Sequence, residues 1–248
     1  MNIKDDGRGL YPEPEPLKVQ GPRLPEQLLG VFTAPVPLFR RLAANPRWGS
    51  ALLTLMGFTL AMVLVWAARV DPDALLRPVM MRDPAITPEQ VGRTIEVWGR
   101  LLGLFGAFGV LVGMPVMAQL MAFLFWLVGR CLPGPGGPPD YRRALSAVVV
   151  PGLVALPRMI LVSVLCLAKP VRGFAPDAIS PMSLGFLFST GHGKLDAVLR
   201  GFDLFAAANL VLLFLAARHI LGLKASGALV CAVAWTALTV GCLLLAPA

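Results

Sequence analysis

The sequence predicts an all-α protein: a polytopic membrane bundle with five transmembrane helices. Hydrophobic residues make up 56% of the 248 residues and charged residues only 15%, against roughly 45–50% and about 25% in soluble domains. The apolar residues gather in five long runs, without the two-residue alternation typical of barrel strands. Because backbone groups in lipid must be paired within the spanning structure, these runs are expected to be helices.

The lengths of the runs predict where the chain crosses the membrane. At 1.5 Å per residue, about 20 residues cross a hydrocarbon core of roughly 30 Å. The fourth run is the shortest, with only residues 204–217 between Asp203 and Arg218, but both of these side chains can extend to the interfaces. A re-entrant or buried segment is the alternative for this run. One transmembrane domain, residues 49–248, is thus predicted with spans at 49–68, 101–128, 144–168, 202–222 and 225–246.

Two segments are expected to precede the first span. Residues 1–24 include a proline-rich run and are predicted to form a disordered cytoplasmic tail. No stretch before residue 49 has the apolar core of a signal peptide. Residues 25–48 are predicted to be amphipathic and interfacial, with a surface helix over 35–45. An ordinary helix packed on the bundle is the alternative for 35–45. The expected interfacial anchors are Arg40, Arg41, Arg47 and Trp48.

Basic residues between the runs predict the orientation. Of the 22 Lys and Arg residues, twelve lie in the segments on the N-terminal side of the membrane and nine in those on the other. By the positive-inside rule the N-terminus is cytoplasmic and the C-terminus extracytoplasmic. The composition, rich in Ala, Gly, Arg and Pro, is typical of a high-GC bacterium, so a bacterial cytoplasmic (inner) membrane is expected. The net charge of +8 is attributed to loops that face anionic lipid, and no nucleic-acid partner is expected.

The second span is predicted to begin well outside the membrane. Residues 87–90 form a capping box with Pro88 at the first helical position, and Pro115 is expected to kink the helix. Five glycines recur along it every three or four residues, a pattern that lets helices approach closely. Packing within the chain is favoured for this row, and an oligomer interface is the alternative. The row consists of Gly99, Gly103, Gly106, Gly109 and Gly113.

Arg158 is the one charged residue in the interior of a predicted span, which makes it a candidate functional residue. At the helical rise it lies roughly 15 Å below the outer end of its span, and Asn209 lies roughly 9 Å below that of the fourth. We expect a structural bridge from Arg158 to Asn209, or to Asp203 if the fourth span sits deeper. A substrate or proton path is the alternative. On the structural interpretation, Arg158→Leu is expected to change stability little.

The residues suggest no catalytic, cofactor or metal site. Neither histidine lies in the HExxH motif of zinc proteases, and the chain has no P-loop and no GxGxxG. Ser189, His192 and Asp196 lie within eight residues, but the fold brings triad members together from distant positions, so a flexible loop is favoured. We therefore predict no enzymatic activity and no cofactor.

The order of these features resembles that of bacterial Yip1-domain proteins. The resemblance is carried by GVFTAP (30–35) and FRRLAANPRW (39–48) before the first span, YRRAL (141–145) before a proline-bearing span, and residues 203–205. It covers about residues 26–246 and implies five membrane helices, a cytoplasmic N-terminus and no known enzymatic activity. Eukaryotic relatives are associated with Rab GTPases and vesicle traffic, but this chain lacks their DLYGP-like signature.

The predicted function is therefore that of a non-enzymatic membrane scaffold or adaptor that acts through protein contacts in the membrane. A small transporter, or an accessory subunit of a transport complex, is the alternative. An intramembrane enzyme ranks last, because the spans contain nothing that pairs a nucleophile with a base. The expected partners are the lipid bilayer and other membrane proteins, including further copies of this chain.

Overall fold

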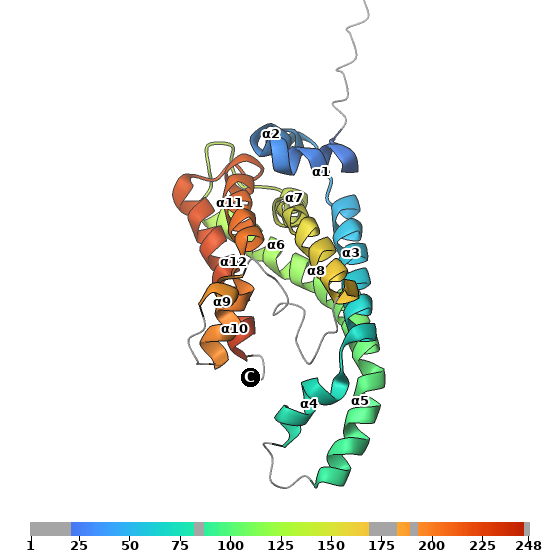
Figure 1. Ribbon diagram of the computed structural model, residues 1–248. Helices are drawn as coiled ribbons and strands as arrows, with labels where there is room; N and C mark the ends of the chain where they lie inside the picture. Colours follow the sequence, from blue (N-terminus) through green and yellow to red (C-terminus); the bar gives the residue numbers. More distant parts are fainter. Residues whose placement is uncertain (1–20, 82–86, 169–182, 189–192, 246–248) are drawn as a thin grey trace, which may run out of the picture.

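The computed structural model describes residues 21–81, 87–168, 183–188 and 193–245, which form a helical bundle without β-strands in these ranges. In chain order the helices are α1 (Leu24–Thr33), α2 (Pro35–Ala44), α3 (Gly49–Arg69), α4 (Pro72–Met80), α5 (Pro88–Phe108), α6 (Met114–Cys131), α7 (Tyr141–Val149), α8 (Leu156–Ala168), α9 (Leu184–Leu187), α10 (Gly193–Gly201), α11 (Leu204–His219) and α12 (Ala225–Leu245). Figure 1 shows α1 and α2 across one end of the bundle, whereas α4 and the first half of α5 extend beyond the other.

Within the described ranges, three helical stretches are long and apolar enough to cross a membrane. They are Gly49–Arg69, Glu89–Cys131 and Tyr141–Ala168. Two further apolar helices, Leu204–His219 and Ala225–Gly241, fall below the same length criterion. These five stretches coincide with the five predicted runs and confirm a helical membrane bundle. The count of five spans stays a prediction.

The second stretch is one long helix with a defect in its middle. Its start is the predicted capping box: Thr87 Oγ1 accepts from the Gln90 N–H at 3.4 Å, and Gln90 Oε1 accepts from the Thr87 N–H at 2.9 Å. A π-helical turn, Gly109–Gly113, joins α5 to α6. It ends two residues before Pro115, which lacks the N–H of the normal hydrogen bond to the preceding turn. Single π turns of this kind accommodate one extra residue within a helix.

The third stretch also changes its winding in the middle. The α7 helix gives way to a 3₁₀ segment, Pro151–Ala155, before α8 begins at Leu156. Pro151 cannot donate a backbone hydrogen bond, so α7 cannot continue through it. Pro157 occupies the first turn of α8, where a missing N–H costs nothing. This interruption places Arg158 at the start of a new helix.

The main core lies between the long helices and the α1–α2 end. Helix α2 buries Leu38, Phe39 and Leu42 against the bundle, mostly against α11. The apolar side of the predicted surface helix over 35–45 thus packs on the helical bundle, which was the alternative expected for this segment. Helix α1 instead exposes Leu29 and Phe32.

A two-helix arm, consisting of α4 and residues 88–100 of α5, projects from the opposite end (Figure 1). Val91 and Ile95 are buried in it, and α4 packs along α5. Its surface carries three ion pairs at i,i+4 spacing: Asp73–Arg77, Glu89–Arg93 and Glu96–Arg100. The arm therefore has an apolar seam, and its exterior carries these charged pairs together with the exposed side chains of Val97 and Trp98.

Candidate functional site

The charged centre of the bundle is an ion pair between α8 and α11. Arg158 Nε lies 2.9 Å from Asp203 Oδ2. The Asp203 side chain is completely buried, and 26% of the Arg158 side chain is exposed. Of the two partners expected for Arg158, the structure brings Asp203 to it.

Asp203 also caps α11. Its Oδ1 accepts from the Ala206 N–H at 2.8 Å, the bond expected of an N-cap aspartate. The carboxylate therefore lies between a guanidinium and the N-terminal end of α11, and it interacts favourably with both. One acidic side chain thus both starts α11 and balances the charge on α8.

The backbone of Asp203 pairs with the residue that precedes α9. Ser183, which is buried just before α9, forms an isolated antiparallel β-bridge with Asp203. The Leu184 N–H donates to the Phe202 carbonyl at 2.8 Å. The chain on both sides of α9 and α10 is therefore tied together beside the carboxylate.

Asn209 does not join this network. Its Oδ1 is buried and has no hydrogen-bond partner in the described part of the chain. The expected bond from Arg158 to Asn209 is therefore wrong. Asn209 lies six residues, or roughly 9 Å, along α11 from Asp203, and the guanidinium is already engaged by the nearer carboxylate.

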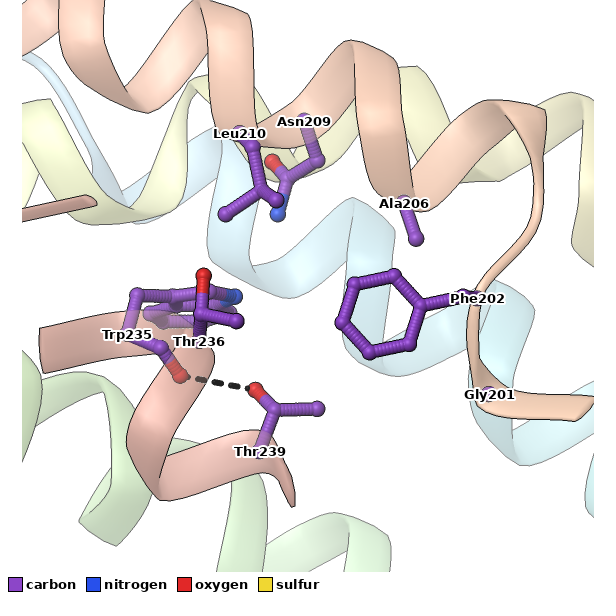
Figure 2. A pocket seen from close by; sticks show the side chains of 8 residues that line it. All are labelled: Gly201, Phe202, Ala206, Asn209, Leu210, Trp235, Thr236 and Thr239. Atoms are coloured by element: carbon purple, nitrogen blue, oxygen red, sulfur yellow. Dashed lines mark hydrogen bonds between the residues drawn. The ribbon is translucent and has the colours of Figure 1, made fainter. Parts of the chain in front are cut away.

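Asn209 instead lines two hollows. A smaller one, of about 50 Å³, is lined by residues that include Phe202, Thr236 and Thr239. A larger, half-open one, of about 270 Å³, is lined by residues of α3, α6, the α7–α8 stretch, α11 and α12. Trp235 lines both. Figure 2 shows Asn209 reaching from α11 into the smaller hollow, with Trp235 and Thr236 of α12 across from it.

The predicted glycine row is only partly a contact face. A Cβ atom added to Gly106 would lie 2.5 Å from Val63 Cγ1, and one added to Gly99 would lie 2.9 Å from Pro72. A Cβ atom added to Gly103 would lie 3.7 Å from Ala67 Cβ, which is ordinary van der Waals contact. These three glycines pack inside the chain.

The last two glycines of the row do not share that face. Gly109 and Gly113 lie in the π turn, and an added Cβ at either would meet nothing within 4 Å. The five-glycine row is therefore wrong as a single face, because the extra residue of the π turn rotates the following side chains relative to the preceding ones.

The predicted interfacial residues lie at the α1–α2 end. Arg40 and Arg47 are exposed, and Trp48 is half-buried against the core. Arg41 pairs with Glu26 of α1 at 2.5 Å, which links α1 to α2. The anchoring role of these residues toward lipid stays a prediction.

Sequence reasoning missed two polar side chains that fix helix ends. Arg69, the last residue of α3, donates to the Cys166 and Leu167 carbonyls at 3.3 and 3.0 Å and so caps α8. Gln27 is fully buried and donates to the Pro22 and Arg47 carbonyls, each at 3.0 Å. A basic residue at the end of an apolar run was the available signal for Arg69, since such residues often bond free carbonyls.

Of the triad-like residues, Ser189 and His192 lie outside the described ranges, as do residues 1–20 of the predicted tail. Among the residues that the structure places, no group of three or more His, Cys, Asp or Glu could hold a metal ion.

Comparison with known proteins gave one match. Neither the curated proteins nor the solved structures include a match to this chain. The family model of the Yip1 domain, however, matches residues 29–246, nearly the whole chain. Together with the long apolar helices, this identifies an integral membrane protein, and the chain belongs to the Yip1 domain family.

Proposed function

We propose that this Yip1-domain protein is a non-enzymatic scaffold or adaptor of the bacterial cytoplasmic membrane that acts through contacts with other membrane proteins. Its N-terminus is cytoplasmic and its C-terminus extracytoplasmic. The observation that carries the proposal is the two-helix arm, which extends beyond the bundle at the end away from α1 and α2 (Figure 1).

The length of the arm's long helix supports this function. The Glu89–Cys131 stretch has 43 residues, or about 65 Å at the helical rise, roughly twice the hydrocarbon thickness. Only 6% of its most apolar window is buried by the rest of the chain, against 44% for Tyr141–Ala168. The helix thus offers one continuous surface to neighbours both in the membrane and beyond it.

The arm is also firmly built. Pro72 of α4 packs against Gly99 of α5, and the capping box fixes the start of α5. Val97 and Trp98 are exposed on the arm, and Trp98 stacks on Phe105 with ring centroids 5.4 Å apart. A rigid helix pair that presents an aromatic side chain is a favourable protein-binding surface.

A small transporter, or an accessory subunit of one, is the second candidate. The central cavity beside Asn209 favours it. Against it stands the ion pair: Arg158 is neutralised by Asp203, so the intramembrane cation is not free to bind a transported anion. In a scaffold the pair has only a structural role. In a transport path Arg158 and Asp203 would have to separate before Arg158 could bind a transported anion.

Site-specific photocrosslinking in cells tests the proposal. A photoreactive residue at Arg93 or Trp98 is expected to give discrete protein adducts that mass spectrometry identifies. The matched control is Leu120 of α6, which is similarly exposed on the same long helix but lies within its apolar stretch. Absence of protein adducts at both arm positions contradicts the arm as a docking surface, and an ATPase subunit among the adducts favours the transport alternative.

Reporter fusions at the two ends test the threading. A cytoplasmic reporter is expected to be active at residue 1 and an extracytoplasmic one at residue 248. Activity of the cytoplasmic reporter at both ends would show an even number of spans. In that case α11, the shortest of the five apolar helices, would be the predicted span that does not cross the membrane.

A further inference from the structure

Helix α1 contacts the rest of the protein on two of its sides. Toward the bundle, Gln27 and Val31 are buried. Toward α2, a Cβ atom added to Gly30 would lie 3.2 Å from Leu38, and the ion pair described above links the same two helices. These contacts fix which side of α1 faces away from the protein.

The outward side of α1 is apolar. Leu29 and Phe32 are three residues apart, so they are neighbours on the helix surface. Leu29 is 70% exposed and Phe32 is 51% exposed. An interfacial helix that lies in the plane of a membrane directs large apolar side chains into the lipid in this way.

A hydrogen bond fixes α1 at the level where the first apolar stretch begins. Gln27 Nε2 donates to the Arg47 carbonyl at 3.0 Å, and α3 starts two residues later, at Gly49. Figure 1 shows α1 lying across the end of the bundle beside the start of α3. Because α3 is apolar and long enough to cross a membrane, its first residues mark the edge of the hydrocarbon core. A helix at this level has its outward side among lipid headgroups and the adjoining acyl chains.

The cations beside α1 have no acidic partners. Arg23 and Arg47 are exposed, and neither forms an ion pair within the described ranges. A Cβ atom added to Gly21 would lie 3.1 Å from Arg47 Cδ and Nε, so the Arg47 side chain passes the backbone two residues before Arg23. Guanidinium groups bind phosphate, and basic residues at this level attract anionic lipids. An acidic protein would also complement the arginines, but the level of α1 beside the start of α3 favours lipid.

We propose that α1 is embedded in the bilayer interface and binds anionic phospholipids. Leu29 and Phe32 lie between the lipids, and Arg23 and Arg47 bind the lipid phosphates. The lipid contact expected for the surface helix over 35–45 thus belongs to α1, since α2 buries its apolar side in the bundle. This surface lies at the end of the bundle opposite the two-helix arm (Figure 1), so it is independent of the scaffold function.

Photocrosslinking in nanodiscs made of equal parts phosphatidylglycerol and phosphatidylcholine tests the proposal. Full-length protein carries p-benzoylphenylalanine in place of Phe32, or in place of Leu29 if the first variant does not fold, and mass spectrometry identifies the adducts. Leu53, which is exposed within the apolar α3, is the control for contact with bulk lipid. Arg40, on the side of α2 opposite its buried residues, is the control for contact with water.

Lipid adducts are expected at Phe32 and at Leu53 but not at Arg40. The ratio of phosphatidylglycerol to phosphatidylcholine adducts is expected to be roughly fivefold higher at Phe32 than at Leu53, the factor for one basic contact with anionic lipid.

A charge variant tests the phosphate contacts separately. Arg23→Gln/Arg47→Gln is expected to retain the lipid adducts at Phe32 but to lower their ratio to that of the bulk-lipid control. The matched control is Arg218→Gln/Lys224→Gln, which removes the same net charge beside the end of α11. This control is expected to keep most of the preference at Phe32.

Four outcomes overturn the proposal. One is the absence of lipid adducts at both Phe32 and Leu29 in folded protein, and another is protein adducts in their place. The third is an equal ratio of the two lipids at Phe32 and Leu53. The fourth is a ratio at Phe32 that the two charge variants change to the same extent, or that neither changes.

Discussion

Replacing Arg158 by leucine is the sharpest test of the intramembrane ion pair. Sequence reasoning expects a small effect, because it pairs Arg158 first with the neutral Asn209 and the substitution removes a charge that is costly to insert. In the structure the Asp203 carboxylate is fully buried and bonded to Arg158, so the single substitution leaves a charge without its partner. Breaking a buried ion pair in this way costs about 3–5 kcal/mol.

The Asp203 carboxylate keeps its hydrogen bond from the Ala206 N–H in this variant, which offsets part of the loss. We therefore expect Arg158→Leu to lower the free energy of unfolding by about 3–4 kcal/mol.

The double variant Arg158→Leu/Asp203→Asn is the matched control. Asparagine is as good an N-cap as aspartate, so the bond to the Ala206 N–H can persist. With both charges gone, the loss is expected to fall below about 1 kcal/mol, because apolar replacement of a whole buried pair is often neutral or stabilising.

Equilibrium unfolding in mild detergent, followed by tryptophan fluorescence, of wild type, the two single variants Arg158→Leu and Asp203→Asn, and the double variant measures the double-mutant cycle. If the single variant is within about 0.5 kcal/mol of wild type, the pair carries no structural energy. If the double variant is as unstable as the single one, the loss comes from packing at Arg158 and not from the stranded carboxylate.

The remaining predictions concern function, packing and pH. The folded double variant is expected to complement a deletion strain fully if the pair is structural; failure with intact folding favours a transport path. Gly106→Leu is expected to lower the free energy of unfolding by about 1–3 kcal/mol, because its Cβ would lie 2.5 Å from Val63 Cγ1. Gly109→Leu, which has open space around its Cβ, should stay within about 0.5 kcal/mol of wild type. Equal losses of the two variants in thermal unfolding would contradict the π-turn geometry. The hydrogen bond from Arg77 holds the pKa of Asp73 below its ordinary value of 3.8, so its contribution is present above that pH and is lost as the pH falls through the lowered pKa. Amide-exchange protection in α4 is expected to drop there in wild type but to show no such step in Asp73→Asn.

Much of the fold follows from local sequence. The five apolar runs gave the main helices because backbone pairing in lipid leaves no other option for such runs. The capping box at Thr87 and the ion pairs on α5 formed as expected, since they depend only on residues three or four positions apart. Features that involve a single turn of helix can thus be predicted from one sequence.

Changes of helix winding could not be predicted in the same way. Both interruptions lie beside a proline, Pro115 in the second stretch and Pro151 in the third, yet one is a π turn and the other a 3₁₀ segment. Proline removes a hydrogen bond in either case, and the packing of neighbouring helices decides how the turn compensates. The glycine row failed as a single face for this reason, because its register changes at the π turn.

The link between Arg158 and Asp203 shows why the site needed the structure. Helix α11 has 16 residues, or about 24 Å, which is shorter than a hydrocarbon core of roughly 30 Å. If α11 spans the membrane as predicted, its capping carboxylate sits below one membrane surface unless the bilayer thins, and a lone charge there is expensive. Arg158 lies ten residues, or roughly 15 Å, before the end of α8, at a depth where it can meet that carboxylate. As predicted spans, the short α11 and the charged α7–α8 stretch each look unfavourable in the sequence, but the pair between Arg158 and Asp203 would let α11 end inside the membrane with its charge balanced.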